Sequence, residues 1–217
     1  MTFREKRALD AGRGRIDAFS KYRDSSQGTN ELLDSVKEPP DKVVVGVVPL
    51  LKEHGVKKVL DAGCGYGRNS IFLAKEGFHV TALDNSSKAL KVVESRVKEE
   101  KLGNVRILKG DVRKVEVPEV FDAVVIDSVF GLNEKKKMQE TVNTVEGILK
   151  SGGIIVVKGF FSKKEIEEVF KNFRLISGKK EDIPITDRYG PDRETGSWVL
   201  VGEKKEPAPK LPERMQP

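Results

Sequence analysis

A glycine-rich turn between a buried strand and a helix constrains this chain most. A short apolar run ends at Leu60, which is typical of a strand inside a parallel sheet. Glycines follow at positions 63, 65 and 67, and a segment with helical spacing begins at Arg68. Glycine lets the backbone take positive φ values and approach a ligand closely. A strand, a glycine turn and a helix N-terminus in this order predict a nucleotide-type binding site in an α/β fold.

Two acidic residues near the turn restrict the ligand. Asp61 stands two positions before the first glycine, and Asp84 follows the next apolar run, residues 78–83. A carboxylate in the position of Asp84 typically binds a ribose, because it can accept two hydrogen bonds at once. The turn departs from the dinucleotide pattern G-x-G-x-x-G, since Arg68 stands where the third glycine belongs. A diphosphate would be repelled by Asp61, whereas an amino or sulfonium group would be attracted, which favours S-adenosylmethionine over NAD or FAD.

The rest of the chain alternates between strand-like and helix-like segments. We expect strands at residues 57–61, 78–83, 104–109, 121–126 and 153–158, and helices at 68–76, 86–101, 134–150 and 162–172. Such alternation predicts a parallel sheet with helices on both faces. Residues 173–177 and 197–202 add two further strands.

Composition divides the chain into three parts. Residues 1–38 are polar and basic, residues 39–202 carry the alternating segments, and residues 203–217 hold four prolines and are expected to be disordered. Near the start of the middle part, residues 43–51 repeat valine and leucine at helical spacing after a proline pair that suits a helix start. Their β-branched side chains and Pro49 also fit a strand, so both interpretations stay open.

The composition favours a cytoplasmic protein with one domain. A chain of 217 residues suits a single core, and its 34% of charged residues, rich in Lys and Glu, leans toward a thermophile. One cysteine excludes an internal disulfide and a cysteine-cluster metal site, and no apolar run approaches the roughly 20 residues of a membrane span. The net charge of +6 invites an anionic partner, but the lysines alternate with glutamates and lack interleaved aromatics. Nucleic acid binding is therefore the less favoured alternative.

Four segments in order resemble the motif series of class I S-adenosylmethionine-dependent methyltransferases. They are residues 61–67 (DAGCGYG), 83–84 (LD), 109–112 (KGDV) and 121–127 (FDAVVID), each near the end of an expected strand. The resemblance covers roughly residues 40–160. It implies a Rossmann-like, doubly wound sheet of seven strands, mostly parallel with an antiparallel strand at the C-terminal edge. It also implies that residues 1–38 form a variable cap over the active site. Residues 67–70, with Phe78 and Asp84, are also similar to the tellurite-resistance type of small methyltransferases.

The resemblance implies roles at the methionine end of the cofactor. Asp61 would hold the amino group, directly or through water, and Gly63, Cys64 and Gly65 would surround the methionine part. Asn69 would either reach the methionine carboxylate or cap the helix that begins beside it. Cys64 is not expected to act as a nucleophile, because it lies in the turn that approaches the cofactor.

The adenosine end is expected to lie along the next two strands. Asp84 would accept hydrogen bonds from both ribose hydroxyls, with Asn85 and Ser86 along the adenine edge. In the family that the chain resembles, Asp111 takes the adenine amino group and the backbone N–H of Val112 reaches a ring nitrogen. The alternative for each of these acidic residues is a structural role as a helix cap.

The chemistry of transfer is expected near Asp127, which follows the fourth strand. Its carboxylate would balance the sulfonium charge or accept a proton, or else be purely structural. A late polar segment contributes Arg188 and Tyr189, and the N-terminal part contributes Tyr22, as candidate substrate contacts or as solvated residues. No residue pattern predicts a metal site.

These residues predict direct methyl transfer to a small molecule, with S-adenosylhomocysteine as the second product. Ser128-Val129-Phe130 follow Asp127 instead of the Pro-Pro-aromatic run of amino-methylating nucleic acid enzymes, and the chain has no Pro-Cys pair. The alternatives are methylation of RNA or of a ribosome-associated protein, a NAD-binding oxidoreductase, and a non-catalytic protein that binds S-adenosylmethionine. The oligomeric state stays open.

Overall fold

The computed structural model describes residues 38–117, 119–129, 135–181 and 196–206, and the folded unit begins at Pro40. Tyr22, Arg188, Tyr189 and the expected cap up to residue 37 lie outside the described residues. The helices are α3 (Lys42–Glu53), α4 (Arg68–Lys75), α5 (Ser87–Glu99), α6 (Lys135–Ile148) and α7 (Lys163–Val169), and the strands are β1 (Lys58–Ala62), β2 (His79–Asp84), β3 (Val105–Lys109), β4 (Phe121–Asp127), β5 (Leu149–Phe161), β6 (Phe173–Glu181) and β7 (Gly196–Lys204).

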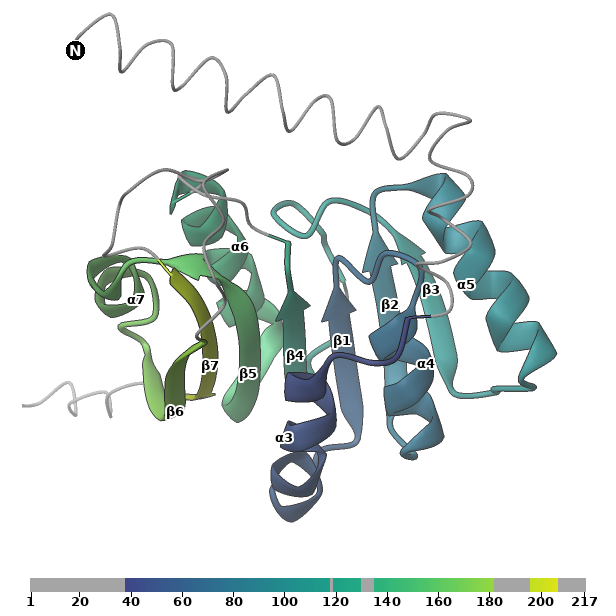
Figure 1. Ribbon diagram of the computed structural model, residues 1–217, viewed down its shortest axis with the longest axis horizontal. Coiled ribbons are helices and arrows are strands. Elements are labelled where there is room, and N and C mark those ends of the chain that lie inside the picture. The colour runs from purple at the N-terminus through teal and green to yellow at the C-terminus, as the bar shows by residue number, and fades with distance from the viewer. Residues whose placement is uncertain (1–37, 118, 130–134, 182–195, 207–217) are drawn as a thin grey trace, which may run out of the picture. The chain divides into compact units, whose positions relative to one another are not determined.

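The strands form one sheet in the order β3-β2-β1-β4-β5-β7-β6, drawn in Figure 1. β1 to β5 pair in parallel, and β7 runs antiparallel to both β5 and β6. The expected seven-stranded, mostly parallel sheet is confirmed. Its antiparallel strand, β7, lies next to the C-terminal edge, and β6 forms the edge itself.

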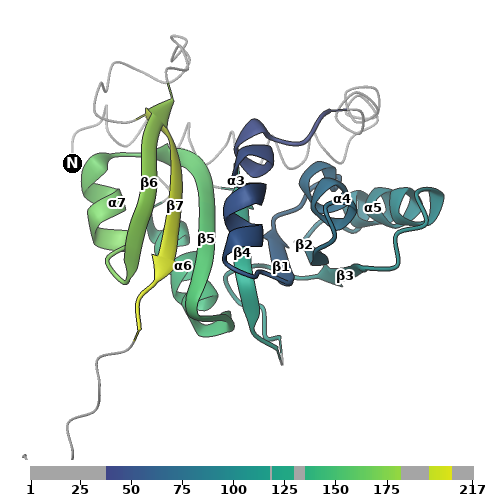
Figure 2. The ribbon, with the colours of Figure 1, turned by 90° about the horizontal axis from the view of Figure 1, so that it is seen from below.

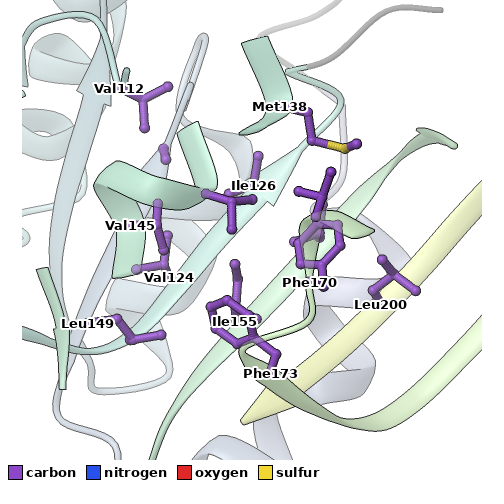
Figure 3. Close-up of a cluster of buried hydrophobic side chains, with 14 of the residues drawn as sticks. Val112, Val124, Ile126, Met138, Val145, Leu149, Ile155, Phe170, Phe173 and Leu200 are labelled. Atoms are coloured by element: carbon purple, nitrogen blue, oxygen red, sulfur yellow. The ribbon is translucent and has the colours of Figure 1, made fainter. Parts of the chain in front are cut away.

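Helices cover both faces of the sheet. α3 and α4 pack over β1, β2, β4 and β5 through a cluster that includes Leu51, Leu73, Val59 and Val156. α5 packs on the same face, because its cluster contains Ala82, two residues along β2 from Val80 of the first cluster. α6 and α7 cover the opposite face with the apolar side chains shown in Figure 3. Figure 2 shows α3 and α7 on opposite sides of β5.

Residues 42–53, for which both helix and strand were open, form the helix α3. Asp41 caps it by accepting a hydrogen bond from the backbone N–H of Val43 at 2.9 Å. Pro49 lies inside the helix and removes one backbone donor. Four apolar positions recur at helical spacing and are buried, so packing against the sheet outweighs the low helix propensity of valine. These positions are Val44, Val47, Val48 and Leu51.

Several expected boundaries are wrong. β5 spans Leu149–Phe161 instead of residues 153–158, and β6 continues to Glu181, past the expected end at residue 177. α6 ends at Ile148 instead of residue 150, and β5 begins directly at Leu149. Leu149 pairs with Phe121 of β4 next to a register shift, so strand pairing overrides the helical pattern at this junction. α7 ends at Val169, three residues before the expected end. β7 continues to Lys204, whose ammonium donates to the carbonyl of Leu149 at 2.6 Å, so the strand runs past residue 202.

None of the described helices combines the length and the apolar character that a membrane span needs.

Candidate functional site

The four motif segments meet at one edge of the sheet. β1 and β2 run parallel with Ala62 beside Leu83, and Asp84 at the end of β2 pairs with Lys109 at the end of β3. The arrowheads of β1, β2 and β4 point to the same edge in Figure 1. Parallel strands present their carboxyl ends together, and ligands of open α/β sheets bind there. The edge carries the glycine turn, Asp84, Asp111 and Asp127.

The glycine turn needs glycine for conformation and for space. Gly63, Gly65 and Gly67 have φ values of +78°, +54° and +79°. A Cβ on Gly63 would lie 2.5 Å from Cγ2 of Val129, and one on Gly67 would lie 2.9 Å from Cγ2 of Val93. The backbone N–H of Gly63 donates to the carbonyl of Leu83 at 2.8 Å, which ties the turn to β2. The turn is therefore held in a conformation that leaves bare backbone at the sheet edge.

Asp84 connects the turn to the next strand. Its Oδ2 accepts from the backbone N–H of Gly65 at 2.9 Å, and its Oδ1 accepts from the backbone N–H of Ser86 at 2.8 Å. These two hydrogen bonds hold the carboxylate beside the glycine turn, and a carboxylate oxygen can in general accept more than one hydrogen bond. The Ser86 hydroxyl accepts from the backbone N–H of Ala89 as the N-cap of α5, and Asn85 is exposed.

Asp61 is buried in the same place. Only 1% of the residue is exposed, and the hydroxyl of Ser70 on α4 donates to its Oδ2 at 2.5 Å. Burial raises the pKa of Asp61 to about 7, with the Ser70 hydrogen bond opposing this effect and the nearby Asp127 and Asp84 adding to it. Burial also raises the pKa of the Cys64 thiol, so this side chain stays neutral and is a poor nucleophile.

Asp127 accepts hydrogen bonds from three side chains. Its Oδ2 takes Nη2 of Arg68 at 2.8 Å and Nδ2 of Asn69 at 2.9 Å, and its Oδ1 takes the hydroxyl of Ser128 at 2.9 Å. Ser128 has a φ of +57°, an uncommon value for a residue other than glycine. Asn69 lies in the first turn of α4, and the N-cap of this helix is Gly67, with no side-chain cap hydrogen bond. The helix-cap alternative for Asn69 is therefore wrong.

The network continues to α3 and β5. Oδ1 of Asn69 accepts from the backbone N–H of Asp41 at 2.9 Å, and Oδ2 of Asp41 takes the ammonium of Lys158 at 2.8 Å. Burial alone would raise the pKa of Asp41, but hydrogen bonds from Lys158 and Val43, with the charges of Lys158 and Arg68, lower it below its ordinary value. The network therefore fastens the start of α3 to the carboxyl edge of the sheet.

Three members of this network are not predicted from the sequence: Arg68, Asp41 and Lys158. The one signal in the sequence is that Lys158 ends the expected strand 153–158, which follows Asp127 in the chain, and the structure pairs these two residues in register. Polar residues at the ends of neighbouring parallel strands meet at one edge, so this placement could have been expected.

Asp111 holds an arginine from its own turn. The guanidinium of Arg113 donates from Nε to both carboxylate oxygens, at 2.9 and 3.0 Å, and its Nη2 contacts Oδ2. These hydrogen bonds lower the pKa of Asp111 and outweigh its partial burial. Val112 is buried beside it. An adenine amino group at this position would share the carboxylate with Arg113.

The residues at this edge fit S-adenosylmethionine better than a dinucleotide. Asp61, Asp84 and Asp127 bring three carboxyl groups close enough to interact electrostatically, with Arg68 as the opposing charge. This arrangement disfavours a diphosphate and favours a ligand with ammonium and sulfonium groups. Gly63 and Asp84 supply the bare backbone and the ribose acceptor that such a nucleoside needs. No cluster of possible metal ligands occurs within the described residues.

A second hollow lies at the opposite edge. A cavity of about 290 Å³ opens at the amino ends of the strands, with Lys58, Thr81 and Arg106 in its lining. Glu119 pairs with Lys58 at 3.2 Å and with Arg106 at 2.7 Å, so its carboxylate offsets one of these two positive charges. Of the motif residues only Phe121, at the start of β4, lines this cavity, and we assign the cavity no part in the site.

Comparisons with known proteins agree with this geometry. A model of a family described as "Methyltransferase domain" matches residues 59–153. The chain is 29% identical over 187 residues to glycine/sarcosine N-methyltransferase of Aphanothece halophytica, covering 79% of this chain and 68% of that protein. It is 34% identical over 148 residues to "Putative methyltransferase YqeM" of Bacillus subtilis (strain 168), covering 67% of this chain and 58% of that protein.

The fold has solved counterparts as well. The crystal structure of TehB from Haemophilus influenzae matches with a TM-score of 0.60 and 22% identity over 74% of this chain and 62% of that one. The chain thus spans between about three fifths and two thirds of the length of these similar proteins. On the strand order, the glycine turn and these likenesses together, the chain belongs to the class I S-adenosylmethionine-dependent methyltransferases, enzymes whose cofactor is S-adenosylmethionine.

Proposed function

We propose that this chain transfers a methyl group from S-adenosylmethionine directly to a nucleophilic atom of a small-molecule acceptor. The observation that carries the proposal is the bare glycine turn with Asp61, Asp84 and Asp127 around it. S-adenosylmethionine, when bound, supplies an electrophilic methyl group on a sulfonium that needs no further activation. The protein then has to bind, align and exclude water, and alignment alone can lower a barrier by about 7 kcal/mol or more.

Apart from Asn69, the cofactor-binding residues are assigned as the sequence predicts. Asp84 accepts the ribose hydroxyls, and Gly63, Cys64 and Gly65 present backbone to the methionine part. Asp61 holds the ammonium group. The adenine ring is bordered by Asn85, Ser86, Asp111 and Val112. Arg113 is an additional neighbour of the ring, because its guanidinium already donates to the carboxylate of Asp111.

Asp127 is proposed as a fixed negative charge near the methyl group and not as a general base. Arg68, Asn69 and Ser128 already donate to its two oxygens, so these three side chains fix its position and occupy acceptor sites that a substrate proton would need. A fixed carboxylate stabilises the positive sulfonium in the bound state. Asn69 accordingly acts through Asp127 and Asp41, and we no longer expect it to reach the methionine carboxylate.

A small-molecule acceptor is supported by likeness and by surface charge. The relative from Aphanothece halophytica is named for methylation of glycine and sarcosine, both small amines. The +6 charge is the feature that favours RNA. Several surface lysines are paired with glutamates one helical turn away, such as Lys98 with Glu94 at 2.8 Å, so they form no uninterrupted basic surface there. A cytoplasmic location and a thermophilic source stay predictions from composition alone.

Incubation with methyl-labelled S-adenosylmethionine tests the acceptor class. Glycine, sarcosine and a pool of small metabolites are compared with total RNA and ribosomal protein, with the Asp84→Ala variant as the blank. We expect label in the small-molecule fraction, at a rate that changes little when salt is raised. Label in RNA that falls steeply with salt would favour the RNA alternative, because phosphate contacts release counterions. Cofactor binding without transfer to any pool would contradict the enzymatic proposal.

A further inference from the structure

Within the described part of the chain, the buried carboxyl group of Asp61 has a single side-chain donor close to it, Ser70. Asp61 lies on β1 with 1% of its surface exposed, and Ser70 on α4 is fully buried. Among the described residues, the Ser70 hydroxyl is the single recorded hydrogen-bond donor to this carboxyl, at 2.5 Å from Oδ2. A buried carboxylate normally needs two or three donors or a positive partner to stay ionised. The pair therefore leaves an ionised Asp61 poorly compensated.

The surroundings of Asp61 add negative charge. β2 contributes Asp84 and β4 contributes Asp127, and both disfavour ionisation of Asp61. On α4, the guanidinium of Arg68 favours ionisation, but its Nη2 is already paired with Asp127 at 2.8 Å. The thiol of Cys64 in the turn is neutral and offers no charge.

Resting on the cofactor role proposed above, we propose that Asp61 is protonated in a large share of the cofactor-free protein and loses its proton when S-adenosylmethionine binds. The proton passes from the carboxyl group of Asp61 to solvent, and the carboxylate that remains pairs with the ammonium group of the ligand. No other bond forms or breaks. Because linkage is reciprocal, cofactor affinity must rise with pH wherever the empty site holds this proton.

The size of the effect follows from the pKa of Asp61, which is about 7 in the cofactor-free protein. A carboxyl group with that pKa releases about 0.9 proton per bound cofactor at pH 6 and about 0.5 at pH 7. Affinity then rises about five-fold between these two pH values. The α-amino group of the ligand, with an ordinary pKa of about 7.7–8.0, is mostly protonated in this interval and contributes little.

Calorimetric titration in two buffers of different ionisation heat measures the released protons directly. S-adenosylmethionine, S-adenosylhomocysteine and methylthioadenosine are titrated at pH 6 and pH 7. The first two ligands carry the ammonium group and are expected to release protons equally, whereas methylthioadenosine lacks it and is expected to release few. Release by S-adenosylmethionine alone would assign Asp61 to the sulfonium and overturn its pairing with the ammonium.

Two variants separate this inference from the proposed function. Ser70→Ala removes the donor that lowers the pKa of Asp61, so proton release at pH 7 is expected to rise above the wild-type value. Asp61→Asn is expected to release no protons on binding. In wild type, the infrared band of the protonated carboxyl group is expected to disappear when the cofactor binds, and in Asp61→Asn this change is expected to be absent. Ser162→Ala removes another serine hydroxyl, at the N-cap of α7, and is expected to match wild type.

The outcomes are distinguishable. S-adenosylmethionine binding with the same proton count in wild type, Ser70→Ala and Asp61→Asn would overturn the proton coupling and leave the proposed function standing. A count that rises in Ser70→Ala supports the coupling even if Asp61→Asn binds too weakly to measure. Absence of binding to wild type would overturn both proposals together.

Discussion

Replacing Asp84 by alanine is expected to weaken S-adenosylmethionine binding by about 100-fold or more. The proposed ribose contacts are two hydrogen bonds to a charged acceptor, each worth about 1.5–3 kcal/mol, and each 1.4 kcal/mol is a factor of ten in affinity. The substitution also releases the backbone N–H groups of Gly65 and Ser86, which loosens the turn. Calorimetric titration of the folded variant, verified by circular dichroism, measures the loss.

Asp122 provides a matched control for this substitution. Its Oδ2 accepts from the backbone N–H groups of Lys57 and Lys58 at 2.7 and 2.8 Å, much as Asp84 accepts two backbone donors. Asp122 lies near the start of β4, at the opposite edge from Asp84. Asp122→Ala should therefore lower stability but leave affinity within about two-fold, since no contact near the turn changes. Equal losses of affinity in both variants would mean that the effect is structural and that Asp84 does not hold the ribose.

Replacing Gly63 by alanine is expected to destabilise the protein by about 2–5 kcal/mol and to abolish measurable cofactor binding. A φ of +78° costs an alanine about 1–2 kcal/mol. The new Cβ would lie 2.5 Å from Cγ2 of Val129, and such overpacking adds about 1–3 kcal/mol. The contact forces the backbone of the turn away from its position, so the surface that approaches the ligand is lost. Urea unfolding gives the stability and titration gives the affinity.

Gly55 and Val129 separate the two causes. Gly55 has a φ of +65° with nothing near its Cβ position, so Gly55→Ala should show the conformational cost alone, about 1–2 kcal/mol, and bind cofactor normally. Adding Val129→Ala to Gly63→Ala removes the contact and should restore part of the stability, which a double-mutant cycle detects as coupling. Equal destabilisation in Gly55→Ala and Gly63→Ala, with no coupling to Val129, would contradict the close contact at the turn.

The local features of the site were predictable from sequence because local chemistry determines them. The positive φ values of the turn favour glycine, and Asp84 follows an apolar run whose length is typical of a strand. Serine is a residue type that favours helix N-caps, and Ser86 is the N-cap of α5 in the structure. The alternation of strands and helices was sufficient to predict a parallel sheet.

The rest depends on tertiary contacts that the sequence does not show. Lys158 reaches Asp41 across 117 positions of the chain, and Asn69 links Asp41 to Asp127 only because α3 and α4 lie side by side on the sheet. The change from α6 to β5 at Leu149 follows from pairing with Phe121 and not from a helix-stop signal. Hydrogen-bond networks of this kind form only when the fold brings distant segments together. A sequence pattern can therefore predict the network residues that lie at strand ends, but not the others.

The most direct test of the cofactor assignment is titration of the wild-type protein with S-adenosylmethionine, S-adenosylhomocysteine and NAD under the same conditions. We expect both adenosyl amino acids to bind with dissociation constants of about 1–100 μM, in the range of ordinary enzyme–ligand affinities. NAD is expected to show no measurable binding, because Asp61 and Arg68 stand where a diphosphate site needs an uncharged turn and a glycine. Binding of NAD in preference to S-adenosylmethionine, or of neither, would contradict the assignment of this edge as a methyltransferase site.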